Sequence, residues 1–232
     1  MKNIIALTIL AAAATAGAQT LDSVTTAVTN TITRNNIELG LTGGYAGGLS
    51  GEVFVHAPNV IGPVGVKVGV AYTRTSDAIT DSSDIGAGPF SGYKTAGATE
   101  RGSATVVSVD GTYGLGEVAP GIDTMVYGGA RYGKFSATED YGSNLTTTYS
   151  SNAFGLGAGA MASYALSGNL SLVGDVGADY FFKSTIDRKS NTAAGPTSDT
   201  YATEDVNYND FNNRFIRPGT SFKARVGIKY MF

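Results

Sequence analysis

A two-residue alternation of apolar and polar side chains runs through most of this 232-residue chain. It is plainest in SFKARVGIKYMF (221–232), where the even-numbered residues are apolar and, Met231 apart, the residues between them are polar or glycine. This period is typical of a β-strand with one apolar and one polar face. Eight segments follow it, and most are as long as a tilted membrane strand: 35–46, 51–57, 64–75, 103–116, 124–136, 152–166, 170–183 and 220–232. They predict an all-β chain that is either soluble or crosses a membrane as strands.

The first 34 residues stand apart from this pattern. MKNIIALTILAAAATAGAQT combines a basic start, a short apolar run and the small residues Ala16-Gly17-Ala18, which is typical of a secretory signal peptide over 1–18. A membrane-anchoring helix is the alternative, but the run is short for one. Residues 19–34 are polar and rich in threonine, and we interpret them as a periplasmic lead-in to a barrel over 35–232. The absence of cysteine excludes a disulfide framework, and a net charge of −3 argues against a nucleic-acid partner.

The connections between the predicted strands differ in length in a regular way. From the second connection onward, short segments (58–63, 117–123, 167–169) alternate with long ones (76–102, 137–151, 184–219). If the mature N-terminus lies in the periplasm, every long connection faces outward. Short periplasmic turns with long outer loops are typical of outer-membrane barrels, whereas a β-sandwich has no reason to collect its long loops at one end.

Aromatic residues on the apolar faces separate by height along the strands. One predicted group lies near the outer end: Tyr45, Tyr72, Tyr132, Phe154, Tyr180, Phe182 and Phe222. A second lies near the periplasmic end: Tyr113, Tyr164, Tyr230 and Phe232. Two aromatic girdles around an aliphatic band favour a transmembrane up-and-down antiparallel eight-stranded β-barrel. The alternative, aromatic packing in a soluble barrel, would not sort these residues by height.

The opposite register predicts a charged interior. Besides His56, it holds five acids and five bases: Glu38, Glu52, Asp110, Asp175, Asp179, Lys67, Arg131, Lys223, Arg225 and Lys229. Buried charges must be paired or solvated. We therefore expect Asp175 and Asp179 to pair with the bases of the last strand, and Glu38 to meet that strand where the barrel closes. Glu52 and Lys229 are expected in water at the rims. Eight strands leave a space that side chains fill, so no wide pore is expected.

Reactive chemistry is sparse in this sequence. His56, the only histidine, is read as a polar residue facing the lumen, with catalysis the weaker alternative. Asp77, Asp81 and Asp84 are read as part of a solvated loop, with a divalent-cation site as the alternative. Arg74 and Lys134 fall on the outward face at the outer rim, where they either pair with lipid phosphates or extend to the headgroups. We assign no catalytic residue, no cofactor and no metal site.

These features together resemble the small OmpA/OmpX-type outer-membrane β-barrel proteins. The resemblance is architectural and covers 35–232. It implies that Val226, Ile228, Tyr230 and Phe232 form the signal that the outer-membrane assembly machinery recognises. A peptidoglycan-binding domain is not expected to carry over, since nothing follows Phe232. The expected function is a non-enzymatic outer-membrane structural and surface protein, with outer-membrane lipid as a partner. A narrow channel for ions or small solutes is one alternative. The other is an adhesin whose outer loops bind an extracellular ligand, for which their Tyr, Ser, Gly and Asn content is suggestive.

Overall fold

The computed structural model describes residues 37–75, 77–86, 88–215 and 219–232. The predicted signal peptide (1–18) and the predicted lead-in segment (19–34) lie outside these ranges. Within the described ranges, ten strands and two short helices follow one another: β1 (Glu38–Ala46), β2 (Leu49–Ile61), β3 (Val64–Thr75), α3 (Phe90–Thr95), β4 (Thr99–Ala119), β5 (Ile122–Asp140), β6 (Thr146–Ser167), β7 (Leu170–Phe181), β8 (Ile186–Thr192), β9 (Gly195–Tyr201), α4 (Tyr208–Arg214) and β10 (Thr220–Met231).

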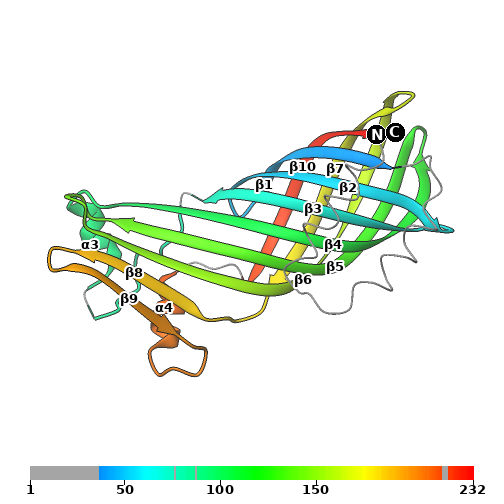
Figure 1. The fold of residues 1–232 in the computed structure, drawn as a ribbon. Coiled ribbons are helices and arrows are strands. Elements are labelled where there is room, and N and C mark those ends of the chain that lie inside the picture. Colours follow the sequence, from blue (N-terminus) through cyan, green and yellow to red (C-terminus); the bar gives the residue numbers. More distant parts are fainter. Residues whose placement is uncertain (1–36, 76, 87, 216–218) are drawn as a thin grey trace, which may run out of the picture.

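Eight of the strands close into an antiparallel barrel (Figure 1). Their order round the wall is β1, β2, β3, β4, β5, β6, β7 and β10, and β10 pairs back with β1. The residue pairing followed round the ring from Glu38 reaches β10 at Ser221, whereas Glu38 itself pairs with Met231. This stagger of ten positions (231 − 221) means that the strands are tilted, as barrel closure requires.

The two ends of the barrel differ. At one end, called the turn end, two-residue turns join β2 to β3, β4 to β5 and β6 to β7. Gly62 and Gly121 lie in the first two turns with φ of 60° and 76°, a conformation that tight hairpins require and that glycine adopts without strain. At the other end, called the cap end, β4, β5 and β6 continue beyond the ring, toward the left of Figure 1. The β8–β9 hairpin extends their sheet by pairing with the first part of β6.

The cap end is more ordered than the sequence predicts. The segment 137–151, expected to be a loop, is strand as far as Asp140 and again from Thr146. The segment 184–219 contains β8, β9 and α4, and 76–102 contains α3 and the start of β4. Threonine and serine hide the alternation there, although threonine suits strands. The inward positions remain apolar at Phe135, Ala137 and Tyr149.

An apolar core fills the inside of the cap end, where α3, α4 and the preceding segments cover the concave face of the sheet. Its buried residues are Ala78, Ile79, Phe90, Phe135, Ala137, Tyr149, Ala153, Phe181, Ile186, Tyr208, Phe211 and Phe215. Tyr149 stacks on Phe215, and Phe135 meets Phe181 edge to face. Because Phe135 and Phe181 also line the space above the charged lumen, the core closes this end of the barrel.

Candidate functional site

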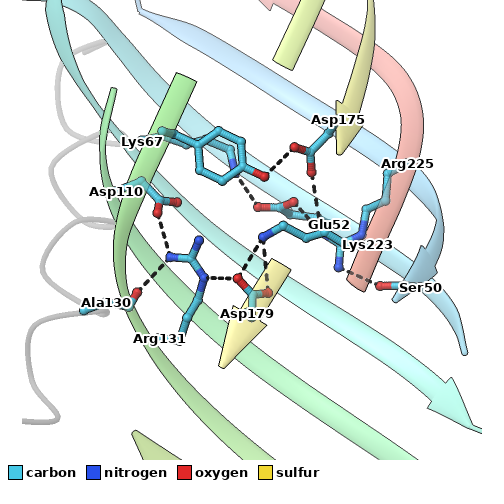
Figure 2. A network of polar contacts seen from close by, with 11 residues as sticks. Ser50, Glu52, Lys67, Asp110, Ala130, Arg131, Asp175, Asp179, Lys223 and Arg225 are labelled. Carbon is cyan, nitrogen blue, oxygen red and sulfur yellow. Dashed lines mark hydrogen bonds and ion pairs between the residues drawn. The ribbon is translucent and has the colours of Figure 1, made fainter. Parts of the chain in front are cut away.

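The centre of the lumen is a network of charged side chains (Figure 2). Glu52 on β2 joins two cations, because Lys67 Nζ on β3 and Arg225 Nη1 on β10 each donate to one of its carboxylate oxygens at 2.7 Å. Arg225 also donates to Ser50 Oγ at 2.9 Å. The expectation that Glu52 lies in water at a rim is wrong. Since β2 begins at Leu49, earlier than predicted, Glu52 falls inside the wall and is 4% exposed.

Arg131 links the other side of the network. Its guanidinium donates to Asp110 Oδ1 on β4 at 2.6 Å and to Asp179 Oδ1 on β7 at 2.7 Å. Lys223 on β10 donates to both oxygens of Asp179, at 3.1 and 3.2 Å. Gly157 on β6 makes this meeting possible, because a Cβ there would collide with Asp179 Oδ1 and Arg131 Nε. These contacts tie β4, β5, β7 and β10 together across the lumen.

Tyr127 also belongs to the network, although the amino-acid sequence does not identify it as a network residue. The hydroxyl donates to Asp175 Oδ1 at 2.6 Å, and Arg225 Nη1 lies 4.0 Å from Asp175 Oδ2. Gly159 and Gly177 leave the space that this phenol occupies. Large charged and aromatic side chains thus fit one barrel because the positions facing them are glycine, which accounts for part of the 32 glycines.

A second polar cluster lies toward the turn end. Lys229 Nζ donates to Glu38 Oε1 at 2.7 Å, and His56 Nδ1 lies 2.7 Å from Glu38 Oε2. Thr112 Oγ1 lies 3.0 Å from His56 Nε2. Lys229 does not pair with Asp175 or Asp179, because its neighbour on β7 is Ser171, four residues before Asp175. The Thr–His–Glu arrangement contains residue types used in hydrolysis, but His56 is 4% exposed and its contacts cross-link three strands.

Apolar side chains close the lumen on both sides of the charges. Phe54, Met125, Met161 and Val173 form a buried cluster toward the turn end. At the other side, a cavity of about 30 Å³ lies between the network and the rings of Phe135 and Phe181, which is room for one or two water molecules. From the turn end to the cap end, the interior therefore consists of the cluster around Glu38 and His56, an apolar cluster, the charged network and an apolar cap.

The cap holds its own ion pair, which the sequence reading missed. Arg214 Nε on α4 donates to Glu139 Oε1 on β5, and the hydroxyls of Tyr141 and Tyr149 donate to Glu139 Oε2. Burial, reinforced by the Glu139 carboxylate, raises the pKa of both tyrosines. Burial lowers the pKa of Arg214, but the pair with Glu139 more than offsets this and raises it. The alternation of inward residues Phe135, Ala137 and Glu139 in the sequence could have predicted that Glu139 is buried.

The carboxylates of Asp81 and Asp84 bind neighbouring groups of the same loop region. Asp84 accepts from the backbone N–H groups of Gly86 and Gly88, and Asp81 pairs with Lys94, which also pairs with Glu100. These two carboxylates raise the pKa of Lys94. Within the described ranges, no three His, Cys, Asp or Glu side chains form a group that could hold a metal ion.

The outward face carries the aromatic residues. All eleven girdle residues named above are exposed, from Tyr132 at 38% to Phe222 at 72%. Between them the exposed side chains are aliphatic, including Leu41, Val70, Leu156 and Val226. Polar inside and apolar outside is the reverse of a soluble barrel and matches a wall that faces lipid. In the part of the chain that the structure describes, no helix is long and apolar enough to span a membrane.

A comparison with solved structures finds one with this architecture and others that are less similar. The crystal structure of a major outer membrane protein from Thermus thermophilus is 30% identical, with a TM-score of 0.78, and the match covers 86% of this chain and all of that one. Neisserial surface protein A matches at 14% identity and a TM-score of 0.40, covering 85% of this chain and 95% of that one. CarO of Acinetobacter baumannii matches at 13% identity and a TM-score of 0.44, covering 88% of this chain and all of that one. Neither protein-family models nor curated proteins give a match.

The Thermus match covers 86% of this chain, at an identity that shows common ancestry as well as a common fold. The chain crosses the outer membrane with its eight-stranded ring, whose lumen is largely filled by the described inward side chains. It belongs to the family of small outer-membrane β-barrel proteins that includes this major outer membrane protein of Thermus thermophilus.

Proposed function

We propose that this protein is a non-enzymatic integral component of the outer membrane whose barrel is closed to solutes and whose cap end faces the cell exterior. The observation that carries the proposal is the layered interior, in which the ion network lies between two apolar clusters. Conduction would require these cross-strand pairs to separate inside a protein medium, where an unpaired charge is costly. The protein then contributes to the membrane through its wall and its exterior surface.

Conductance tests this proposal against the narrow-channel alternative. Purified, folded protein is inserted into planar lipid bilayers and its current is recorded over a range of voltages. We expect no conductance above the protein-free background, while a wide porin added to the same bilayer gives clear steps. Reproducible small steps that scale with the amount of folded protein would instead establish a channel.

A surface-binding role is the second candidate, and the ordered cap favours it. The cap is a rigid extension of the barrel sheet, and rigid scaffolds commonly present recognition surfaces. Cells producing the protein without β8 and β9 would lose adhesion to a surface that the intact protein binds. Equal adhesion by both cell types would count against this role.

A further inference from the structure

Three cations form a triangle on the outward face at the cap end. Arg74 lies on β3 opposite Ser103 of β4, and Lys134 lies on β5 opposite Thr105 of β4. Arg101 precedes Ser103 by two residues, so it lies on the same face of β4. The three side chains are exposed and surround the two hydroxyl residues. None of the three forms an ion pair with another described residue.

The triangle lies at the depth of lipid headgroups. Tyr72 precedes Arg74 by two positions, and Tyr132 precedes Lys134 by two, so two of the three cations follow a girdle aromatic on the same face. Arg101 lies two residues beyond Ser103, farther toward the cap end. Aromatic rings mark the membrane–water interface in membrane barrels. The Arg74 guanidinium and the Lys134 ammonium therefore begin where headgroup phosphates lie, and Arg101 lies just above them.

No carboxylate of the described residues lies among the three cations of the triangle. On the outward face of β5, Lys134 is followed by Ser136 and Thr138, and the first carboxylate is Asp140. The exposed carboxylates Glu117 and Asp123 lie opposite each other at the turn end. An anion among the three cations therefore meets cations and hydroxyls. Outward carboxylates flank this face, because Asp140 lies opposite Thr99 and Asp187 lies two residues before Lys189 on β8.

A polar path leads from the triangle into the cap. Arg101 pairs with Thr138, Thr138 with Thr148, and Thr148 with Lys189 of β8, which makes one continuous row across four strands. The row ends in an open groove of about 340 Å³. Side chains lining this groove include Thr146, Thr148, Lys189, Asn191 and Ser198. Hydroxyl, amide and ammonium groups supply the donors and acceptors that sugar hydroxyls need.

We propose that this face binds a phosphorylated glycolipid of the outer leaflet. The lipid phosphate lies among Arg74, Arg101 and Lys134, its acyl chains lie along the wall below Tyr72, and its sugars follow the row to Lys189. Guanidinium groups suit phosphate oxygens, and the site is continuous with the lipid-facing wall. The site is outside the barrel, so it does not depend on whether the lumen is closed.

Native mass spectrometry of the detergent-solubilised full chain tests this site. The probes are bisphosphorylated lipid A, its fully dephosphorylated form, and phosphatidylglycerol. We expect lipid A to bind more tightly than either of the others. The combined variant R74Q/R101Q/K134Q should lose about fivefold in lipid A affinity for each cation removed, since a cation near a membrane surface contributes about 1 kcal/mol. The dephosphorylated lipid should bind the triple variant and the wild type with equal affinity.

Two further variants separate a site from general attraction. K183Q removes an exposed cation just after β7, away from the triangle, and should bind lipid A as the wild type does. T148V/K189M should weaken lipid A binding and leave phosphatidylglycerol binding unchanged. Boiling-dependent gel mobility establishes that each variant is folded. Unchanged lipid A affinity in the triple variant, an equal loss in K183Q, or an unchanged affinity of T148V/K189M for lipid A would overturn the proposed mode of binding.

Discussion

Arg131 is a direct test of the lumen network, since its guanidinium joins Asp110 to Asp179 and the residue is 1% exposed. We predict that Arg131→Met lowers the free energy of unfolding by about 3–5 kcal/mol, because it leaves Asp110 as an unpaired buried charge. Urea titration of the folded protein in lipid vesicles, followed by gel mobility, measures the loss.

A compensating variant identifies the cause of that loss. R131M/D110N removes both charges, and Asp179 keeps Lys223 as its partner. It should therefore recover much of the lost stability. If R131M were as stable as the wild type, the lumen network would not hold the strands together.

Gly157 gives a test of packing at the same place. A methyl group there collides with the carboxylate of Asp179 and the guanidinium of Arg131. We predict that Gly157→Ala destabilises the barrel by about 1–3 kcal/mol, as overpacking does. Gly174→Ala is the matched control, since no atom lies within 4 Å of a Cβ at that position on β7. Urea midpoints that fall equally in both variants would contradict the packing argument.

At the scale of elements, the cap is predicted to loosen in alkali before the barrel does. The pKa values of Tyr141 and Tyr149 are raised in the folded state, by burial first and by Glu139 second. Their contribution to stability is therefore complete below the ordinary tyrosine pKa of about 10 and is lost as the pH rises through the raised values. Proteolysis within β8 and β9, measured against pH, should increase above that point.

The double variant Y141F/Y149F is the control for this alkaline loosening. Phenylalanine cannot ionise, so cleavage in this variant should depend less on pH over the same range. Cleavage that rises identically in both proteins would show that other groups cause it.

The last strand is predicted to serve assembly as well as the wall. Tyr230 and Phe232 are exposed at the turn end, with their rings 5.0 Å apart. If they form part of the assembly signal, Y230A/F232A should reduce the heat-modifiable protein in outer membranes of producing cells severalfold, while refolding in detergent is unaffected. Phe222→Ala changes an exposed aromatic at the other end of β10 and should assemble normally. Equal assembly of both variants would remove this role.

The strands of the wall can be predicted from the sequence better than those of the cap, for a physical reason. In the wall, lipid outside and charges inside produce a strong alternation, so the strands and the pairing of Glu38 with β10 are visible in residues such as Leu39, Leu41 and Ile228. In the cap, water lies outside and the core inside, and threonine and serine weaken the contrast. The residues of the pair Glu139–Arg214 are 75 positions apart in the sequence. The burial of Glu52 depends on the residue at which β2 begins. Such contacts require the three-dimensional register.

At the scale of the molecule, two different cores are stacked along one sheet. The barrel holds charges within an apolar exterior, and the cap holds apolar side chains beneath a polar exterior. The strands β4, β5 and β6 pass through both, so the inward face changes from Asp110 and Arg131 to Phe135 and Ala137 along neighbouring strands. The inward face changes because the surroundings change. The barrel must present an apolar outer face to lipid, whereas the cap has water outside and can hold its apolar side chains within.

This division predicts that the barrel stays closed without the cap elements β8, β9 and α4, since Phe135 and Phe181 lie outside them. Replacing Ile186–Arg214 by a short Gly-Ser linker removes β8, β9 and α4, but it leaves the charged network and the cluster around Phe54 in place. We expect the shortened protein to fold, to remain heat-modifiable and to give no conductance in planar bilayers. Adding R131S and R225S, which removes two large side chains that bridge strands across the lumen, should then produce small cation-selective steps, because Glu52, Asp110 and Asp175 are left with fewer partners. Conductance from the shortened protein alone would assign closure to the cap instead.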